Sequence, residues 1–195
     1  MGRWEPNAVQ RLQQAAWELF AERGYADVTV TEIAERAGLT KRSFFNHFAD
    51  KREVLFAGAQ AFEADVLGYL ADTDADAEPI DAAIAALTRG GLDLTPYREP
   101  ARIRRGLIAS STELQERNLI KMASLTAAIA KALGERRTPA RTAAFAAQAA
   151  VAAFDAAYDD WAADATADFS ALMRQALSDL RHAIDAGHDE EPSRS

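Results

Sequence analysis

The chain of 195 residues contains no cysteine, which excludes disulfide bonds, thiolate metal sites and a cysteine nucleophile. It also has no run of 18 apolar residues without charges, and its first residues hold no apolar stretch typical of a signal peptide. The sequence therefore predicts a cytoplasmic protein with no membrane-spanning segment, and the lack of cysteine fits a reducing compartment.

Residues that favour strands are scarce, with 6 Val and 8 Ile against 45 Ala. Ala is the best helix former, whereas β-branched residues favour strands. The sequence thus predicts an all-α protein, and its length fits one domain or two small domains sharing a core. Apolar periodicity and capping residues predict nine helices and no strand, with helices over about 7–24, 30–37, 41–48, 50–71, 79–91, 100–110, 113–133, 138–163 and 168–186.

Basic residues are outnumbered, because 22 Lys and Arg stand against 30 Asp and Glu, for a net charge of -8. Taken alone, this balance argues against nucleic acid as a partner. The charge is uneven, however: residues 1–52 hold eight basic and seven acidic residues, so the acidity belongs to residues 53–195. The N-terminal part therefore has a locally basic surface of its own.

The segment from residue 29 to 48 has the pattern of a helix-turn-helix. Thr29 and Glu32 form a capping box for a short helix, Gly38 turns the chain, and Thr40 caps the next helix. In this motif the second helix lies in the major groove and presents side chains to base edges. Phe44 and Phe48 are spaced to face inward, which leaves a face suited to bases and phosphates, composed of Lys41, Arg42, Ser43, Phe45, Asn46 and His47.

These residues resemble the DNA-binding domain of the TetR/AcrR regulators. The resemblance covers about residues 9–56 and is carried by Gly24-Tyr25, Val28-Thr29-Val30, Ile33-Ala34, Ala37-Gly38-Leu39-Thr40, Phe44-Phe45-Asn46-His47-Phe48 and Asp50-Lys51-Arg52-Glu53-Val54-Leu55. It implies a homodimeric bacterial transcription regulator, a repressor that binds a palindromic double-stranded DNA operator and is released by a small molecule. It further implies that Thr29 and Lys51 contact phosphates. Independently of the resemblance, the helix start capped by Thr40 suits a phosphate, so Thr40 belongs to the predicted DNA-binding residues.

The resemblance also implies two domains, with residues 1–52 reading DNA and residues 53–195 binding a ligand and dimerising through the last two helices. A polar tail from about residue 187 is expected to be disordered. The C-terminal part, with Trp161, is similar to a subgroup that includes mycofactocin-system regulators. One departure concerns Phe45, where the family usually has a Tyr whose hydroxyl bonds a phosphate, a bond that Phe cannot make.

Candidates for the ligand site are apolar side chains on the fourth to eighth predicted helices, each of which also fits plain core packing. A long hydrophobic effector, such as an acyl thioester, is what the subgroup similarity favours, with Arg104 or Arg105 as anchors for an anionic group. The full set of candidates is Phe62, Leu87, Ile103, Arg104, Leu107, Met122, Leu125, Phe154 and Tyr158.

Catalytic, metal and cofactor sites are not expected. Asp155, Asp159, Asp160 and Asp164 lie along the predicted eighth helix, but that face has no His, so a solvated or dimer-rim face is favoured over a metal site. His182 and His188 are far from any candidate nucleophile, and the nucleotide-binding glycine motifs are missing. Two classes of function stay open: a ligand-responsive DNA-binding regulator, and a helical small-molecule-binding protein whose DNA binding is weakened or lost.

Overall fold

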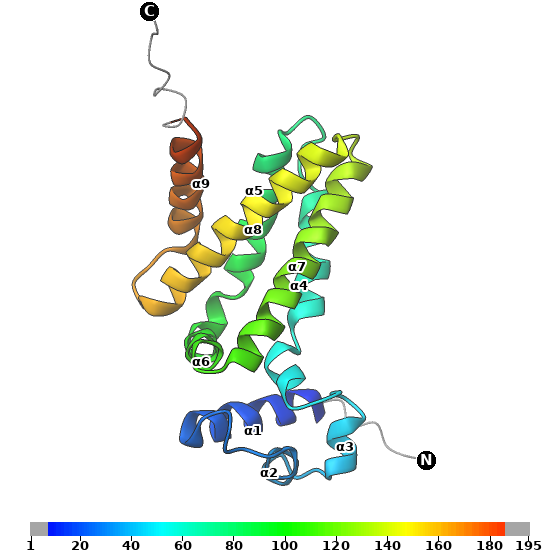
Figure 1. Ribbon diagram of the computed structural model, residues 1–195, viewed down its shortest axis with the longest axis vertical. Coiled ribbons are helices and arrows are strands. Elements are labelled where there is room, and N and C mark those ends of the chain that lie inside the picture. Colours follow the sequence, from blue (N-terminus) through cyan, green and yellow to red (C-terminus); the bar gives the residue numbers. More distant parts are fainter. Residues whose placement is uncertain (1–7, 186–195) are drawn as a thin grey trace, which may run out of the picture. The chain divides into compact units, whose positions relative to one another are not determined.

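The computed structural model describes residues 8–185, and this part of the chain is all-α, as predicted. It contains nine α-helices, two short 3-10 helices and no strand within the described range (Figure 1). The elements are α1 (Ala8–Arg23), α2 (Val30–Arg36), α3 (Lys41–Phe45), η1 (Arg52–Phe56), α4 (Ala59–Ala71), α5 (Pro79–Asp93), η2 (Thr95–Tyr97), α6 (Arg98–Ala109), α7 (Thr112–Glu135), α8 (Ala140–Ala163) and α9 (Phe169–Asp185). The tail predicted to be disordered lies outside the described residues.

The chain forms two compact units that are not continuous in sequence. Unit 1 comprises the residues up to 60 together with residues 99–120, so it holds α1, α2, α3, η1, α6 and the first part of α7. Unit 2 comprises residues 61–98 and the chain from 121 onward. The functional division after residue 52 remains a prediction.

Unit 1 has one apolar core, to which its three N-terminal helices each contribute. Leu12 of α1, Ile33 of α2 and Phe44 of α3 are fully buried there, at 0% exposure. Leu107 of α6 and Leu114 of α7 belong to the same core. Burying one such side chain stabilises the fold by about 1.5–3 kcal/mol. Leu107 and Leu114 therefore contribute to the stability of the helix-turn-helix.

The predicted helix over residues 50–71 is wrong in its first part. Residues 52–56 form the 3-10 helix η1, and α4 begins only at Ala59. Val54, Leu55 and Phe56 are all buried. The 3-10 helix and the turn at residues 57–58 interrupt the predicted helix before α4 begins.

Helix α3 is also shorter than predicted, because it ends at Phe45 instead of Phe48. The N–H groups of His47 and Phe48 both donate to the carbonyl of Phe44, so residues 46–48 continue as a turn. The ring of Phe48 lies 5.3 Å from that of Phe44, which keeps this turn packed on the core.

Unit 2 is built around α8, which packs on both α5 and α9 (Figure 1). The Gly90–Gly91 pair does not end the preceding helix as predicted, since α5 continues to Asp93. A Cβ atom on Gly91 would lie 2.0 Å from a ring carbon of Phe169, at the start of α9. The glycine is therefore required for close helix approach and does not act as a helix stop.

The segment from Arg52 to Ala71 is long and apolar enough, by length and composition, to be a candidate membrane span. In the structure it is divided between η1 and α4. Its side chains Val54 and Phe56 are buried in the core of unit 1, and Val66 is buried as well. Burial within the protein covers 28% of this segment.

Candidate nucleic-acid interface

Helix α2 begins with the capping box that its sequence predicts. The hydroxyl of Thr29 accepts a bond from the backbone N–H of Glu32 at 3.3 Å, and the backbone N–H of Thr29 donates to the Glu32 carboxylate at 2.8 Å. The Thr29 hydroxyl also donates to that carboxylate at 2.7 Å, and Arg23 pairs with it at 2.8 Å. The Thr29 side chain thus positions α2, in addition to its predicted contact with a phosphate.

The capping box makes stability depend on pH in acid. The hydrogen bonds from Thr29, together with Arg23, hold the pKa of the Glu32 carboxyl at about 2, below the ordinary value of 4.5. A lowered carboxyl pKa stabilises the fold above the unfolded pKa, and this stability is lost as the pH falls toward the folded pKa. We expect Glu32→Gln to melt at a lower temperature than the wild type above about pH 5, and the gap to close between pH 4.5 and 2.

Melting curves followed by circular dichroism over this pH range test the prediction. Glu35→Gln, which removes an acid from the same helix but outside the capping box, is the matched control. A gap between wild type and Glu32→Gln that is unchanged at low pH would show that the carboxylate does not stabilise the cap.

The turn between α2 and α3 is closed by Gly38 and Arg11. Gly38 has a φ of 66°, a conformation that residues with a Cβ rarely adopt. The Arg11 guanidinium of α1 donates to the carbonyl of Ala37 and, at 3.4 Å, to that of Gly38. A Cβ on Gly38 would lie 2.8 Å from the Arg11 Nη2, so the glycine and the arginine together determine the angle between α2 and α3.

The residues predicted to contact DNA on the third helix come together in the structure. The Thr40 hydroxyl caps α3 by accepting the N–H of Ser43 at 3.0 Å, and it lies 2.9 Å from the Ser43 hydroxyl. Phe44 is buried, while Phe45 is 49% exposed. The residues that remain exposed are Lys41, Arg42, Phe45, Asn46 and His47, and Ser43 is half-buried.

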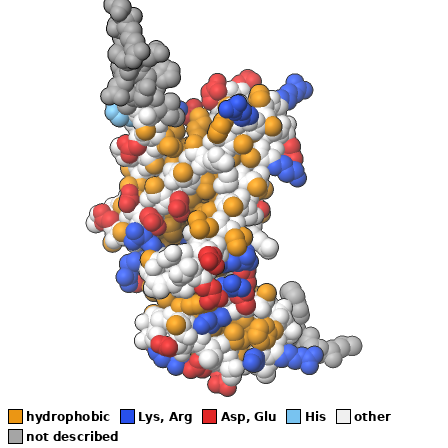
Figure 2. Space-filling model, viewed as in Figure 1, with side chains coloured by type: hydrophobic (Ala, Val, Ile, Leu, Met, Phe, Trp, Pro, Cys, Tyr) orange, Lys and Arg blue, Asp and Glu red, His pale blue; other side chains and the backbone are white. Residues whose placement is uncertain are grey.

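The cations of α3 differ from those of the neighbouring helices. Arg23 pairs with Glu32, and Arg36 pairs with Glu18 and Glu22. Among residues 8–185, the ion pairs include neither Lys41 nor Arg42. Basic and acidic side chains are otherwise interspersed over the face seen in Figure 2. The two α3 cations are therefore available to a negatively charged partner.

Lys51 has a role that the sequence did not reveal. Its ammonium donates to the carbonyls of Tyr25 at 2.7 Å and Val28 at 2.8 Å, and it lies 4.0 Å from the centre of the Tyr25 ring. Burial lowers the pKa of Lys51. The side chain thus stabilises the turn between α1 and α2, in addition to its predicted contact with a phosphate. No sequence pattern indicates which carbonyls it reaches.

The predicted ligand residues are divided between the two units. Ile103, Arg104 and Leu107 belong to unit 1, where Arg104 donates to the Asn118 amide oxygen at 2.9 Å. In unit 2, the ring of Phe154 lies 5.3 Å from that of Phe62 and 6.0 Å from that of Tyr158, in a cluster that also contains Trp161 and Phe169. The remaining candidates of unit 2 are Leu87 and Leu125, both buried, and Met122, which is half-buried.

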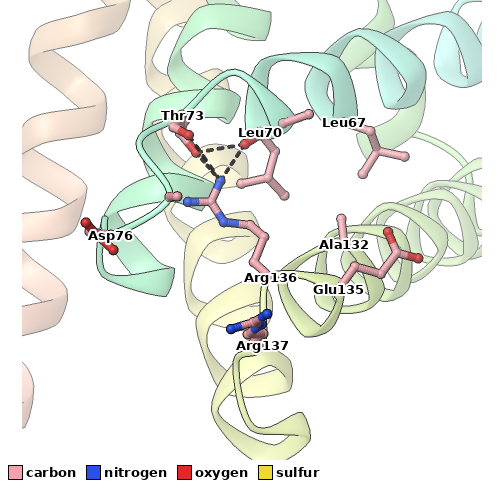
Figure 3. Close-up of a pocket in the computed structure, with 10 residues that line it drawn as sticks. Leu67, Leu70, Thr73, Asp76, Ala132, Glu135, Arg136 and Arg137 are labelled. Carbon is pink, nitrogen blue, oxygen red and sulfur yellow. Dashed lines mark hydrogen bonds between the residues drawn. The ribbon is translucent and has the colours of Figure 1, made fainter.

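A surface hollow of about 730 Å³ lies elsewhere in unit 2, at the ends of α4 and α7 (Figure 3). Arg136 occupies one side of it and donates to the carbonyl of Leu70 at 2.7 Å and to the Thr73 hydroxyl at 2.5 Å. Arg136 thereby satisfies carbonyl groups at the end of α4, which is a structural role. The residues that line the hollow, among them Leu67, Asp76 and Arg137, include none of the predicted ligand residues.

A capped helix, a tight glycine turn and a second capped helix with exposed cations define a helix-turn-helix protein of the DNA-binding class. Residues 12–57 match the family described as bacterial regulatory proteins, tetR family, and residues 77–185, more than half of the chain, match the MftR C-terminal domain. The chain therefore belongs to the TetR family of bacterial transcriptional regulators and carries a C-terminal domain of the MftR type.

Individual relatives agree with this assignment. The chain is 29% identical over 140 residues, or 70% of its length, to MftR of Mycobacterium tuberculosis, named as a mycofactocin biosynthesis transcriptional regulator, and the match covers 69% of that protein. Its fold is similar to that of SmeT of Stenotrophomonas maltophilia in complex with triclosan, with a TM-score of 0.62, 19% identity, and coverage of 88% of this chain and 90% of SmeT. It is also similar to Thermus thermophilus FadR in complex with lauroyl-CoA, with a TM-score of 0.54, 21% identity, and coverage of 87% and 91%.

Proposed function

We propose that this protein is a cytoplasmic repressor, and not an enzyme, that binds a palindromic operator as a homodimer and releases it when a small hydrophobic molecule binds. The observation that carries the proposal is the exposed pair Lys41 and Arg42 on the capped helix α3. Side chains at the start of a recognition helix are the ones that reach base edges and phosphates in the major groove. We propose that Ser43, Phe45, Asn46 and His47 complete this surface, with Thr29, Thr40 and Lys51 at its edge.

Dimerisation through α8 and α9 is supported by the outer face of α8. Phe145 is 58% exposed in the single chain, and the small residues Ala152 and Ala156 are exposed further along the same helix. A second helix can approach such small residues closely and cover the ring. A two-fold dimer also places two reading helices about 34–36 Å apart, the spacing of successive major grooves.

A hydrophobic effector in residues 53–195 is supported by the aromatic cluster of Phe62, Phe154 and Tyr158 in unit 2. SmeT and FadR were seen with triclosan and lauroyl-CoA; triclosan is largely apolar, and lauroyl-CoA carries an apolar acyl chain on a polar, anionic coenzyme A. An effector can weaken DNA binding only by its higher affinity for the state that does not bind DNA. On this basis the ligand would stabilise an arrangement in which the two reading helices no longer match the groove spacing.

Selection of duplexes from a random DNA pool tests the proposal directly. We expect the wild-type protein to enrich a palindrome with half-sites about one helical turn apart, and to sediment as a dimer at about micromolar concentration. A monomer in the sedimentation experiment would contradict the operator geometry. Failure to enrich any sequence would instead favour the alternative of a small-molecule-binding protein that has lost DNA binding, to which the missing hydroxyl at Phe45 would contribute.

A further inference from the structure

Residues of α7 that lie far beyond the helix-turn-helix in sequence take part in its structure. α6 and the first part of α7 belong to unit 1, and Leu107 and Leu114 are buried in the core that also contains Phe20 and Phe44. This apolar contact brings the start of α7 next to residues 50–53, a connecting segment that leads from α3 into the first turn of η1. Polar side chains of α7 also lie at this contact.

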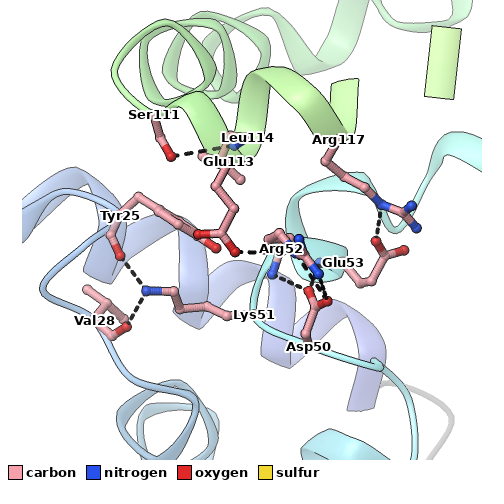
Figure 4. A network of polar contacts seen from close by, with 10 residues as sticks. All are labelled: Tyr25, Val28, Asp50, Lys51, Arg52, Glu53, Ser111, Glu113, Leu114 and Arg117. Carbon is pink, nitrogen blue, oxygen red and sulfur yellow. Dashed lines mark hydrogen bonds and ion pairs between the residues drawn. The ribbon is translucent and has the colours of Figure 1, made fainter. Parts of the chain in front are cut away.

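Two ion pairs join α7 to that connecting segment (Figure 4). Glu113 pairs with Arg52 at 3.4 Å, and Arg117 pairs with Glu53. The side chains of Arg117 and Glu53 are only 28% and 19% exposed. Such a shielded pair is weakened less by solvent and salt than an exposed one.

The same contacts continue to the turn that precedes α2. Asp50 accepts bonds from the backbone N–H of Arg52 at 2.8 Å and of Glu53 at 3.3 Å, which shapes the start of η1. Lys51, between Asp50 and Arg52 in the sequence, donates to the carbonyls of Tyr25 and Val28. Burial, followed by the charge of Glu113 and a hydrogen bond to it, raises the pKa of Tyr25.

We propose that Glu113 and Arg117 are positioning residues for DNA recognition, an inference that rests on the proposed function. Neither residue needs to touch DNA. By holding Arg52 and Glu53, next to Lys51, whose ammonium binds the carbonyls of Tyr25 and Val28, they stabilise both ends of the stretch that carries α2 and α3, and so they determine the angle at which α3 is presented. A reading helix that is tilted loses contacts to base edges first, because those contacts require the closest fit, while general attraction to phosphates persists.

The test compares two DNA affinities for each variant: that for the duplex selected by the wild-type protein, and that for a duplex of unrelated sequence. Arg117→Gln is expected to lower affinity for the selected duplex about tenfold, with less than a twofold change for the unrelated one. Arg117→Lys keeps the charge and should recover most of the loss. Arg102→Gln, which breaks an exposed pair between α6 residues Arg102 and Glu99, is the matched control and should bind as the wild type does.

Arg117→Gln that binds the selected duplex as tightly as the wild type overturns the proposal, as does an equal loss for both duplexes or for the Arg102 control. If Arg117→Gln does not fold, as judged by circular dichroism, Glu113→Gln replaces it, since it removes the charge that pairs with Arg52. A wild-type protein that selects no sequence contradicts the proposed function itself, which keeps the two failures distinct.

Discussion

The double variant Lys41→Ala/Arg42→Ala is expected to bind the operator at least roughly 100-fold more weakly than the wild type at physiological salt. Contacts of these types are worth about 1–3 kcal/mol each when they reach base edges. A dimer would lose four such side chains. Because each phosphate contact releases counterions, the slope of log affinity against log salt should also become shallower by about 3 to 4 if all four contact phosphates.

Fluorescence anisotropy with a labelled operator over a series of salt concentrations measures both quantities. Arg102→Ala/Lys131→Ala is the matched control, because it removes the same charge from exposed positions outside the helix-turn-helix. Its affinity should change by no more than a few-fold. If the control loses as much as the α3 variant, net charge governs binding and the assignment of α3 as the reading helix is wrong.

Gly91→Ala is expected to destabilise the protein by roughly 3 kcal/mol, the upper end of the usual cost of overpacking. The added Cβ would lie 2.0 Å from one ring carbon of Phe169 and 2.3 Å from another, so either the ring or helix α5 must move. Phe169 is 2% exposed and contacts Phe154 and Trp161, which leaves its ring little room. In a chain of this length such a loss lowers the melting temperature by about 6–12 °C.

Gly68→Ala is the matched control in the same unit. Gly68 lies inside α4, and a Cβ there meets nothing within 4 Å. Replacing a helical Gly by Ala stabilises by about 0.5–1 kcal/mol, so the two variants should shift the melting temperature in opposite directions. Equal melting temperatures for Gly91→Ala and the wild type would mean that Phe169 can turn aside without cost.

The sequence predicted local structure well where a local signal existed. The capping box of Thr29 and Glu32 and the turn at Gly38 are both present in the structure, because each depends on residues only a few positions apart. It misjudged the segment after residue 50, where a 3-10 helix with Val54, Leu55 and Phe56 all buried precedes α4. The prediction that Gly90–Gly91 ends a helix was wrong for a related reason. Gly91 is required by the close approach of the Phe169 ring, and Phe169 is remote in sequence.

The candidate site divides in the same way. The exposed face of α3 follows from the spacing of Phe44 and Phe48, so the exposed residues of this helix could be named from the sequence. The anchoring of Lys51 to the carbonyls of Tyr25 and Val28 could not, because backbone carbonyls carry no sequence signal. The predicted ligand residues were chosen by hydrophobicity alone, which does not separate the core of unit 1, where Leu107 lies, from that of unit 2.

By itself the sequence determined the helical class, the helix-turn-helix and the cations of α3, since propensity, capping and periodicity act over a few residues along one helix. Only the tertiary structure decided that α6 and the start of α7 belong with the helix-turn-helix, and that Glu113 and Arg117 bind its connecting segment. The physical reason is distance along the chain: Arg117 and Glu53 pair across 64 residues, and only packing of Leu107 and Leu114 into the N-terminal core brings them together.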